Sequence, residues 1–364
     1  MSPIAVEQTP DAIEAIKAGV AATTIGDVKV DLRSFASFDT APSIGTEFPA
    51  ASIDGKPVLD IRAVLEDPEK QKALAKLVSE RGVVFFRNAI LSPSEQKDLA
   101  IALGTQSGKP ATSGLHTHPL TFQDSEEGDE VTIISNDYRD AKKKVPIYGE
   151  RRLGKTGWHS DITFEPIPSD YATLQLRTLP PVGGDTLWAS AYEAYDRLSP
   201  SIQTLLEGYT AVHEANFFKL VAAARGEKIR DGVRGAPENV GDDLKAVHPV
   251  IRTNPVTGWK GLFVNKGFTK RIVEVTAPES DALLEFLFEH ISANHDLQTR
   301  FRWEENSLAI WDNRSTFHTA TQDVGDAKRI GTRSVSLGER PYFDPKSQSR
   351  RKALGITDDF DSIA

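Results

Sequence analysis

The sequence predicts a mainly β fold with flanking helices. Three observations carry this prediction: short apolar runs of strand length recur along the chain, few segments have helical periodicity, and helices do not alternate regularly with the strands. Runs of this kind are typical of sheet sandwiches and barrels, whereas a parallel α/β core requires a helix between successive strands. The chain has no internal repeat and no low-complexity tract.

The N-terminal part of the chain combines an irregular arm with a helix, a strand and a second helix. Residues 1–55 mix Ala, Thr, Pro and Asp without sustained periodicity, so we interpret them as an N-terminal arm with one short helix at 10–19. Leucine and valine at helical spacing predict an amphipathic helix over 68–82. The apolar run at 83–86 predicts a buried strand, and a Ser-Pro start predicts a helix over 92–103.

Strand-like runs continue through the rest of the chain, at 131–135, 172–176, 186–189, 209–213, 248–252, 261–264, 299–303, 308–311 and 334–337. Asn-Pro and Thr-Gly pairs at 253–258 predict a hairpin turn. Apolar residues at helical spacing predict helices over 191–206 and 278–294. We therefore expect residues 56–345 to form one domain, followed by a C-terminal tail at 346–364.

Composition and charge narrow the class of protein. Among 364 residues, 39% are hydrophobic and 26% are charged, which is ordinary for a soluble globular protein. The 43 basic and 52 acidic residues give a net charge of −9, which opposes binding to a phosphate backbone. Short basic runs at 142–144 and 350–352 are interpreted as solvated surface. We therefore expect no nucleic-acid partner.

The absence of cysteine limits the possible chemistry, and the N-terminal sequence indicates where in the cell the protein is expected. The absence of cysteine excludes disulfides, thiolate metal ligands and a thiol nucleophile. Residues 1–10 lack the regions of a signal peptide, and no apolar run approaches the ~18 residues of a membrane span. We expect a cytoplasmic, soluble protein without a membrane partner, and a homo-oligomer is compatible with the sequence.

Three side chains have the donor types of a mononuclear metal site. His159 and Asp161 form a His-x-Asp pair, and His318 lies far downstream. Two imidazoles and one carboxylate can hold one face of Fe(II) and leave the other positions exchangeable, as in non-haem Fe(II) oxygenases. Side chains at i and i+2 of a strand share a face, so the pair can bind one ion, with His318 supplied by another strand. Asp312 and Asn313 are candidates for orienting His318, or for a turn.

Two arginines and one threonine are candidates for holding anions near that metal. Arg329 and Arg333 follow His318, and their even spacing places them on one side of a regular strand. A guanidinium can hold a carboxylate by two charge-assisted bonds. Thr186 follows a Gly-Gly turn and offers a hydroxyl that can donate to a carboxylate. We expect one arginine to hold an anionic co-substrate and the other a second anion.

Together these motifs resemble the taurine dioxygenase (TauD/TfdA) family of Fe(II)/2-oxoglutarate-dependent dioxygenases. The resemblance spans roughly residues 75–343 and is carried, in matching order and spacing, by the runs at 158–164, 183–188, 262–269 and 310–318. It implies a double-stranded β-helix, or jelly-roll, with helical flanks. The motifs are specific for the family and only weakly specific for the substrate.

The resemblance also implies a chemistry. Fe(II) is held by His159, Asp161 and His318, and 2-oxoglutarate chelates the metal through its 2-oxo acid end. The distal carboxylate of 2-oxoglutarate is held by Arg329 and Thr186. With O₂, an unactivated C–H bond is oxidised, and succinate and CO₂ are formed. On an alkyl sulfonate, hydroxylation beside the sulfonate releases sulfite and an aldehyde.

The resemblance places further residues at the substrate. His118 and Arg333 match positions that meet the substrate anion, and His116 is the alternative to His118. The taurine enzymes carry Asn where this chain has Lys155, so a second cation is expected near the pocket, favouring a different or more acidic substrate. Phe217 and Phe218 fall where the lid of the family begins, and we expect one of them, Phe217 or Phe218, to wall the pocket or to pack in the core.

Several alternatives remain beside a dioxygenase acting on a sulfonate. The same chemistry can act on a small carboxylate or amino acid, by hydroxylation, desaturation or oxidative cyclisation. A non-catalytic jelly-roll binding module is opposed by the joint presence of all three ligands and Arg329. A Zn(II) hydrolase lacks a general base and leaves Arg329 without a role. A nucleic-acid demethylase is opposed by the net charge.

Overall fold

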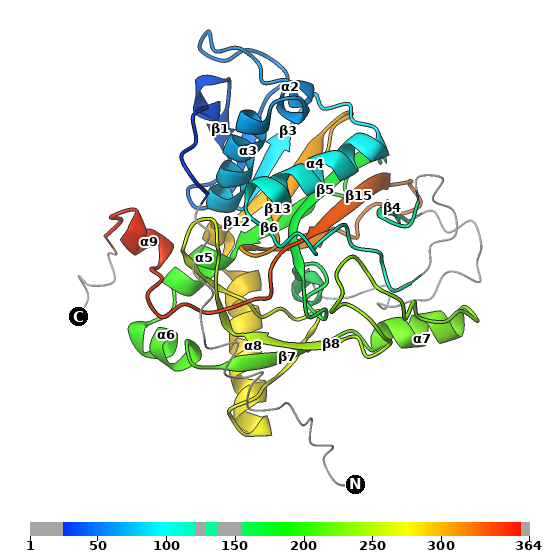
Figure 1. Ribbon diagram of the computed structural model, residues 1–364, viewed down its shortest axis with the longest axis vertical. Coiled ribbons are helices and arrows are strands. Elements are labelled where there is room, and N and C mark those ends of the chain that lie inside the picture. Colours follow the sequence, from blue (N-terminus) through cyan, green and yellow to red (C-terminus); the bar gives the residue numbers. More distant parts are fainter. Residues whose placement is uncertain (1–24, 121–127, 137–153, 358–364) are drawn as a thin grey trace.

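The fold is built mainly from sheet, with helices on its outer faces (Figure 1). The computed structural model describes residues 25–120, 128–136 and 154–357. The helix expected at 10–19 and the basic run at 142–144 lie outside the described residues. The prediction of a mainly β fold with flanking helices is confirmed.

The described strands form four sheets. The strands are β1 (Phe38–Asp39), β2 (Thr46–Phe48), β3 (Val83–Phe86), β4 (Val131–Ser135), β5 (Ser169–Thr178), β6 (Thr186–Ser190), β7 (Thr210–Glu214), β8 (Lys245–Pro249), β9 (Ile251–Thr253), β10 (Lys260–Leu262), β11 (Thr269–Ile272), β12 (Gln298–Phe301), β13 (Leu308–Asp312), β14 (Thr316–Ala320) and β15 (Ile330–Leu337). The largest sheet has the order β1-β2-β3-β13-β5-β15-β4, and its pairs are antiparallel except for β2 with β3. The smaller sheets, β12-β6-β14, β11-β7-β8 and β10-β9, are antiparallel throughout.

The helices are short, and two of them cover the outer face of the largest sheet. They are α2 (Ile61–Leu65), α3 (Pro68–Arg81), α4 (Pro93–Gln106), α5 (Ala191–Asp196), α6 (Pro200–Leu206), α7 (Phe217–Ala224), α8 (Ala277–Ala293) and α9 (Arg350–Ala353), with 3-10 turns η1 (Leu32–Ser34), η3 (Gly154–Gly157) and η4 (His295–Leu297). Helices α3 and α4 lie side by side over β3, β5, β13 and β15 (Figure 1). Ser92 and Glu95 form a capping box at the start of α4, as the Ser-Pro signal predicts.

The main core lies between the largest sheet and the β12-β6-β14 sheet. Trp188 of β6 contacts Phe85 of the largest sheet and is directly opposite His318 in β14. The neighbouring residues Ala189 and Phe317 face the other way, into a second core with α5 and α8. Because strand side chains alternate between faces, the same alternation that buries Trp188 directs His318 into the space between the two sheets.

Several elements differ from the prediction for identifiable reasons. The helix expected over 191–206 is two helices, because Pro200 begins a new helix after its N-cap Ser199. The strand expected over 248–252 is two strands because the chain changes sheets there: β8 ends at Pro249 and pairs with β7, whereas β9 begins at Ile251 and pairs with β10. Strand β14 was not predicted, although it carries His318.

The two ends of the described chain also pack against the domain. Within residues 1–55, β1 and β2 pair with one another, and β2 joins β3; the division into arm, domain and tail stays a prediction. The basic run at 350–352 forms part of α9, where Arg350 is buried and Arg351 pairs with Glu193. The interpretation of that run as solvated surface was therefore wrong. Among the described residues, no helix has the length and apolar character needed to span a membrane.

Candidate metal centre

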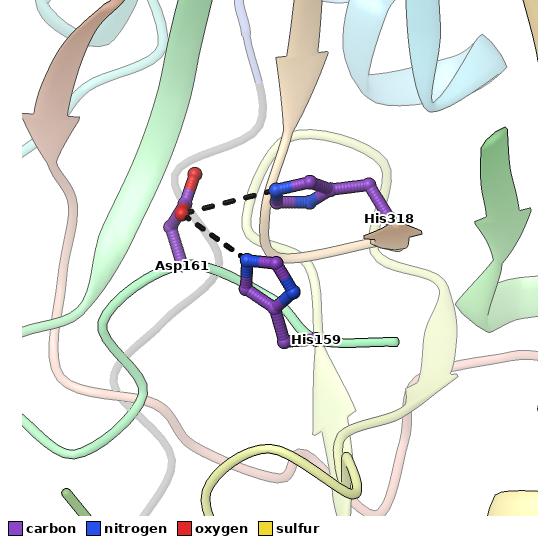
Figure 2. Close-up of side chains that lie close together, drawn as sticks. All are labelled: His159, Asp161 and His318. Atoms are coloured by element: carbon purple, nitrogen blue, oxygen red, sulfur yellow. Dashed lines mark ion pairs between the residues drawn. The ribbon is translucent and has the colours of Figure 1, made fainter. Parts of the chain in front are cut away.

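Two of the expected metal ligands lie opposite one another on neighbouring segments. His159 and His318 form an isolated antiparallel bridge, in which the backbone N of His159 is 3.0 Å from O of His318 and the reverse distance is 2.8 Å. These two bonds fix the backbone at both residues, and the imidazoles emerge side by side with ring centroids 4.3 Å apart (Figure 2). Since β14 pairs with β6 on its other edge, His159 is attached through β14 to the β12-β6-β14 sheet.

Asp161 reaches the imidazoles from a turn. The next residue, Ile162, has φ 51, an unusual conformation for a β-branched residue, so the chain bends directly after Asp161. The amide of Asp161 donates to Oδ1 of Asn313 at 3.0 Å, and the indole of Trp311 donates to the same oxygen at 3.0 Å. The expectation that residues 159 and 161 share one face of a regular strand was wrong, but the turn brings their side chains to the same place.

The three side chains converge (Figure 2). Oδ1 of Asp161 lies 3.8 Å from Nε2 of His159 and 3.8 Å from Nε2 of His318, and one ligand atom of each residue lies within 4.8 Å of the others. Nδ1 of His159 is 2.9 Å from the carbonyl oxygen of Gly157, which requires the proton on Nδ1 and leaves the Nε2 lone pair for a metal. One carboxylate and two imidazoles in this arrangement fit a single Fe(II).

The electrostatics of the site keep the ligands in the metal-binding protonation state. Burial acts to raise the pKa of Asp161, but the charges of Arg333, His318 and His159 outweigh it and lower that pKa to about 2. Burial lowers the pKa of His318 to about 3. Oδ2 of Asp161 and Nδ1 of His318 are buried without a hydrogen-bond partner among the described residues. Buried polar atoms of this kind are rarely left without a ligand or water, so they support a site for an added group.

Arg333 contacts this centre, and His118 lies close enough for the charges of Arg333 and Asp161 to affect its pKa. Arg333, in β15, donates from Nη1 to Oδ1 of Asp161 at 2.6 Å. Burial lowers the pKa of His118 well below its ordinary value, and the charges of His116 and Arg333 lower it further. Nδ1 of His118 accepts from the amide of Leu120 at 3.0 Å, so the ring proton is on Nε2, where it can be donated.

His116, the alternative substrate contact, has a different partner. Its ring is 4% exposed, and Nε2 lies 3.4 Å from Oε1 of Glu165. Glu165 also accepts two hydrogen bonds from Arg234, from Nε at 2.5 Å and from Nη2 at 2.9 Å. His116 therefore belongs to a buried ion-pair cluster, and His118 is better placed to meet a substrate.

Arg329 lies in a different cluster from Arg333. Its Nε donates to the carbonyl oxygen of Gly184 at 2.8 Å and its Nη2 to Oγ1 of Thr186 at 3.1 Å, so the arginine and threonine expected to act together are in contact. Arg329 is 7% exposed and forms no ion pair among the described residues. Burial lowers its pKa to about 10, although the charge of Asp185 acts to raise it. A buried cation without a carboxylate partner is costly unless an anionic ligand compensates it.

Aromatic rings extend from the metal ligands to His118. Phe268 lies 6.1 Å from His159 between ring centroids and 6.0 Å from Phe217, which is at the start of α7. The ring of Phe217 is tilted against that of Phe218 at 4.2 Å between centroids, and the Phe218 ring is 4.9 Å from His118. The structure thus places Phe217 in a row of aromatic rings between His159 and His118.

Lys155 is not brought together with these residues. It lies in η3, and its Nζ is 2.8 Å from Oε1 of Glu285 in α8. Lys266 approaches the other oxygen of the same carboxylate at 2.9 Å. The cation expected near the pocket instead takes part in a partly exposed ion-pair cluster on α8.

Sequence reasoning missed or misplaced several residues around the centre. Asn313 was considered as a support for His318, but it holds the amide of Asp161, while Asp312 pairs with Arg314 at 2.8 Å. No site role was predicted for Trp303, yet it donates a hydrogen bond to Thr186. No periodicity or motif marks the contacts of Asn313 with Asp161 and of Trp303 with Thr186, because each joins segments more than 100 positions apart.

Comparisons with known proteins agree with the geometry. Residues 39–335 match the family described as "Taurine catabolism dioxygenase TauD, TfdA family". Alpha-ketoglutarate-dependent dioxygenase btcD of Neocamarosporium betae is 43% identical over 340 residues, covering 88% of this chain and 96% of that protein. An alpha-ketoglutarate-dependent sulfonate dioxygenase of Saccharomyces cerevisiae is 33% identical over 307 residues, covering 84% and 67%.

A solved structure shares the fold as well. The crystal structure of a taurine dioxygenase from Burkholderia xenovorans superposes with a TM-score of 0.61 at 29% identity, covering 85% of this chain and 92% of that one.

Proposed function

The chain belongs to the TauD/TfdA family of 2-oxoglutarate-dependent dioxygenases, and on that premise we propose that it oxidises a C–H bond of a small alkyl sulfonate and releases sulfite. As a member of that family it uses Fe(II), 2-oxoglutarate and O₂. We further propose that the largest sheet and the β12-β6-β14 sheet are the two walls of a double-stranded β-helix. Their packing around one core, with the candidate site between them, supports this.

Two observations carry the proposal: one carboxylate and two imidazoles converge, and Arg329 is buried without an ion pair among the described residues. His159, Asp161 and His318 would hold Fe(II), because their ligand atoms meet and no other group of described residues offers such a set. Arg329 and Thr186 would hold the distal carboxylate of 2-oxoglutarate. When bound, iron, keto acid and O₂ supply an oxidant for an unactivated C–H bond, with succinate and CO₂ as co-products.

The surroundings of the site orient the substrate. Arg333 and His118 each offer a donor near the metal ligands, and we propose that both bind the sulfonate. The Phe217 and Phe268 rings would exclude water and pack on the carbon chain. We propose no contact from Lys155, whose ammonium is held by Glu285. Oxidation at the carbon bearing the sulfonate gives an unstable alcohol, which collapses to an aldehyde and sulfite.

A second candidate substrate is a small carboxylate or amino acid. The planar guanidinium of Arg333 recognises a carboxylate as readily as a sulfonate, so the anion site alone does not choose between them. The chemistry would be the same, and the product a hydroxylated, desaturated or cyclised acid.

The experiment is a substrate panel with the full chain, Fe(II), ascorbate and 2-oxoglutarate. Succinate formation is compared for taurine, longer alkyl sulfonates, the matched alkyl carboxylates and amino acids, and sulfite is measured in parallel. Sulfite released in step with succinate supports the sulfonate assignment. Succinate stimulated only by carboxylates would overturn it, while leaving the dioxygenase chemistry in place.

A further inference from the structure

We propose that Trp303 is a positioning residue for the keto acid: it orients the hydroxyl of Thr186 toward the distal carboxylate. The inference rests on the proposed co-substrate site. Nε1 of Trp303 donates to Oγ1 of Thr186 at 3.0 Å, and Nη2 of Arg329 donates to the same oxygen at 3.1 Å. Two donors from separate segments therefore meet on one hydroxyl oxygen.

The valence of the hydroxyl decides its role. A threonine oxygen has one hydrogen to donate and two lone pairs that accept. Here the indole and the guanidinium occupy both accepting directions, and neither group can accept a hydrogen bond in return. The hydrogen of Thr186 is thus left to point along the remaining direction, where an acceptor must be supplied. A carboxylate accepts and cannot donate, so it fits the position that this arrangement leaves.

Burial makes the arrangement both rigid and selective. Thr186 is 3% exposed, and Trp303 and Arg329 are 7% exposed each, so water has little access to compete for the hydroxyl. The indole is fixed edge-on against Phe301 at 5.1 Å, and Phe301 is directly opposite Thr186 in the pairing of β12 with β6. Without the indole N–H, the hydroxyl would be free to rotate and could turn its hydrogen away from the carboxylate.

Arg329 and Thr186 have different roles in holding the carboxylate. The guanidinium supplies charge, whereas Thr186 supplies one donor whose direction is set by Trp303. The contribution of Trp303 should therefore be felt only through Thr186, and it should vanish when the hydroxyl is removed. This dependence gives the inference a signature that loss of packing does not reproduce.

The test measures binding of N-oxalylglycine, a keto-acid analogue, to the full chain loaded with Mn(II), by calorimetry. Trp303→Phe keeps the ring and removes the N–H, and loss of one hydrogen bond should weaken binding roughly three- to tenfold. Thr186→Val should weaken it by a similar factor. The double variant should bind no more weakly than Thr186→Val alone. An equal cost of Trp303→Phe in both backgrounds would overturn the proposal, as would no cost in either.

Two other tryptophans provide matched controls. Trp311→Phe removes the indole that donates to Asn313 on the metal side, so it should weaken Mn(II) binding and leave the analogue affinity at saturating Mn(II) near the wild-type value. Trp259→Phe shortens a buried indole that packs on Tyr192, outside the site, and should change neither affinity. If all three variants weaken the analogue alike, the effect is one of packing and the proposal fails.

Two further measurements keep the result interpretable. In the wild-type chain with Zn(II) and ¹⁵N-labelled tryptophan, one exchange-protected indole signal should shift when N-oxalylglycine binds, and the absence of any indole shift would count against the role of Trp303. Arg329→Gln is the reference for the site itself. If Arg329→Gln leaves analogue binding intact, the co-substrate site is misassigned. If it weakens binding and Trp303→Phe does not, only the positioning role falls.

Discussion

Arg333 lies 2.6 Å from Oδ1 of Asp161, the same oxygen that faces Nε2 of both histidines. The guanidinium therefore keeps the carboxylate ionised, and it also offers donors near any substrate that approaches the metal. Arg329, four positions earlier, contacts Gly184 and Thr186. The two arginines thus have different partners, which supports the proposal that they bind different ligands.

This difference predicts that substituting each arginine raises the KM of a different substrate. Arg329→Gln should raise the KM for 2-oxoglutarate roughly tenfold to a hundredfold, since a charge-assisted hydrogen bond contributes about 1.5–3 kcal/mol. Arg333→Gln should raise the KM of the organic substrate by a similar factor and leave that of 2-oxoglutarate near its original value. Succinate formation, with each substrate varied in turn, checks both. A reversed pattern would exchange the two roles.

Removing a metal ligand should abolish both metal binding and turnover. His159→Ala or Asp161→Ala leaves two ligands where three converge, so Mn(II) affinity and succinate formation should be lost together. Equilibrium dialysis and a succinate assay measure the two. His295→Ala, at an exposed position in η4, is the matched control and should retain both. Turnover in either ligand variant would reject the ligand assignment.

Lys155 should be dispensable for catalysis. Because its ammonium pairs with Glu285, Lys155→Ala should leave kcat and the KM of the organic substrate unchanged. Lys266→Ala removes the other partner of the same carboxylate and serves as the matched control. A rise in substrate KM specific to Lys155→Ala would show that the lysine turns toward the pocket during the reaction.

The sequence predicts the site better than it predicts the chain path that builds it. Donor chemistry and the resemblance to a known family together select His159, Asp161 and His318, because few side chains suit Fe(II) and their order along the chain matches that family. The turn at Asp161 is not visible in a pattern, because it depends on positive φ at Ile162 and on an amide bond to Asn313. Both are consequences of tertiary packing, which overrides local preference.

The fold shows the same contrast. Strong local signals, such as the Ser92 capping box, give helix boundaries close to those observed. Strand β14 escaped prediction because its residues are buried on both faces, so apolar and polar residues do not alternate as they do in a half-exposed strand. The direction of Lys155 was equally hidden, since Glu285 lies 130 positions away.

The Glu165–Arg234 ion pair should stabilise the segment that carries Asp161. Both side chains are 1% exposed, and Nη1 of Arg234 also donates to the carbonyl oxygens of Arg230 and Gly241. Arg234→Met leaves the Glu165 carboxylate buried without its partner, so the free energy of unfolding should fall by about 3–5 kcal/mol.

Urea unfolding measures this loss, and a double variant tests its cause. Arg234→Met combined with Glu165→Leu removes both charges and should recover much of the stability. Mn(II) affinity should follow the same order, because Glu165 lies in the turn that begins at Asp161. If the double variant is no more stable than Arg234→Met alone, the loss comes from packing rather than from an unpaired charge.

Asp196 makes stability depend on pH at a place remote from the metal ligands. Burial raises its pKa to about 6 from the ordinary 3.8, and the charge of Glu193 adds to this effect. It is also the last residue of α5, where the helix dipole disfavours a negative charge. The folded state therefore holds this proton more tightly than the unfolded state, so the contribution is favourable below pH 3.8 and is lost as pH rises through about 6.

Asp196→Asn should remove that dependence. In the wild type, the backbone N of Arg351 donates to Oδ2 of Asp196 at 3.0 Å. The side-chain amide of Asn has the same shape as the carboxyl group and can accept this hydrogen bond through its oxygen. A pKa raised by roughly two units corresponds to at most about 3 kcal/mol, so above pH 6 the variant should be more stable than the wild type by up to that amount. Near pH 4 the two proteins should converge. Urea unfolding at both pH values measures the difference, and an equal gain at each would show that charge is not its cause.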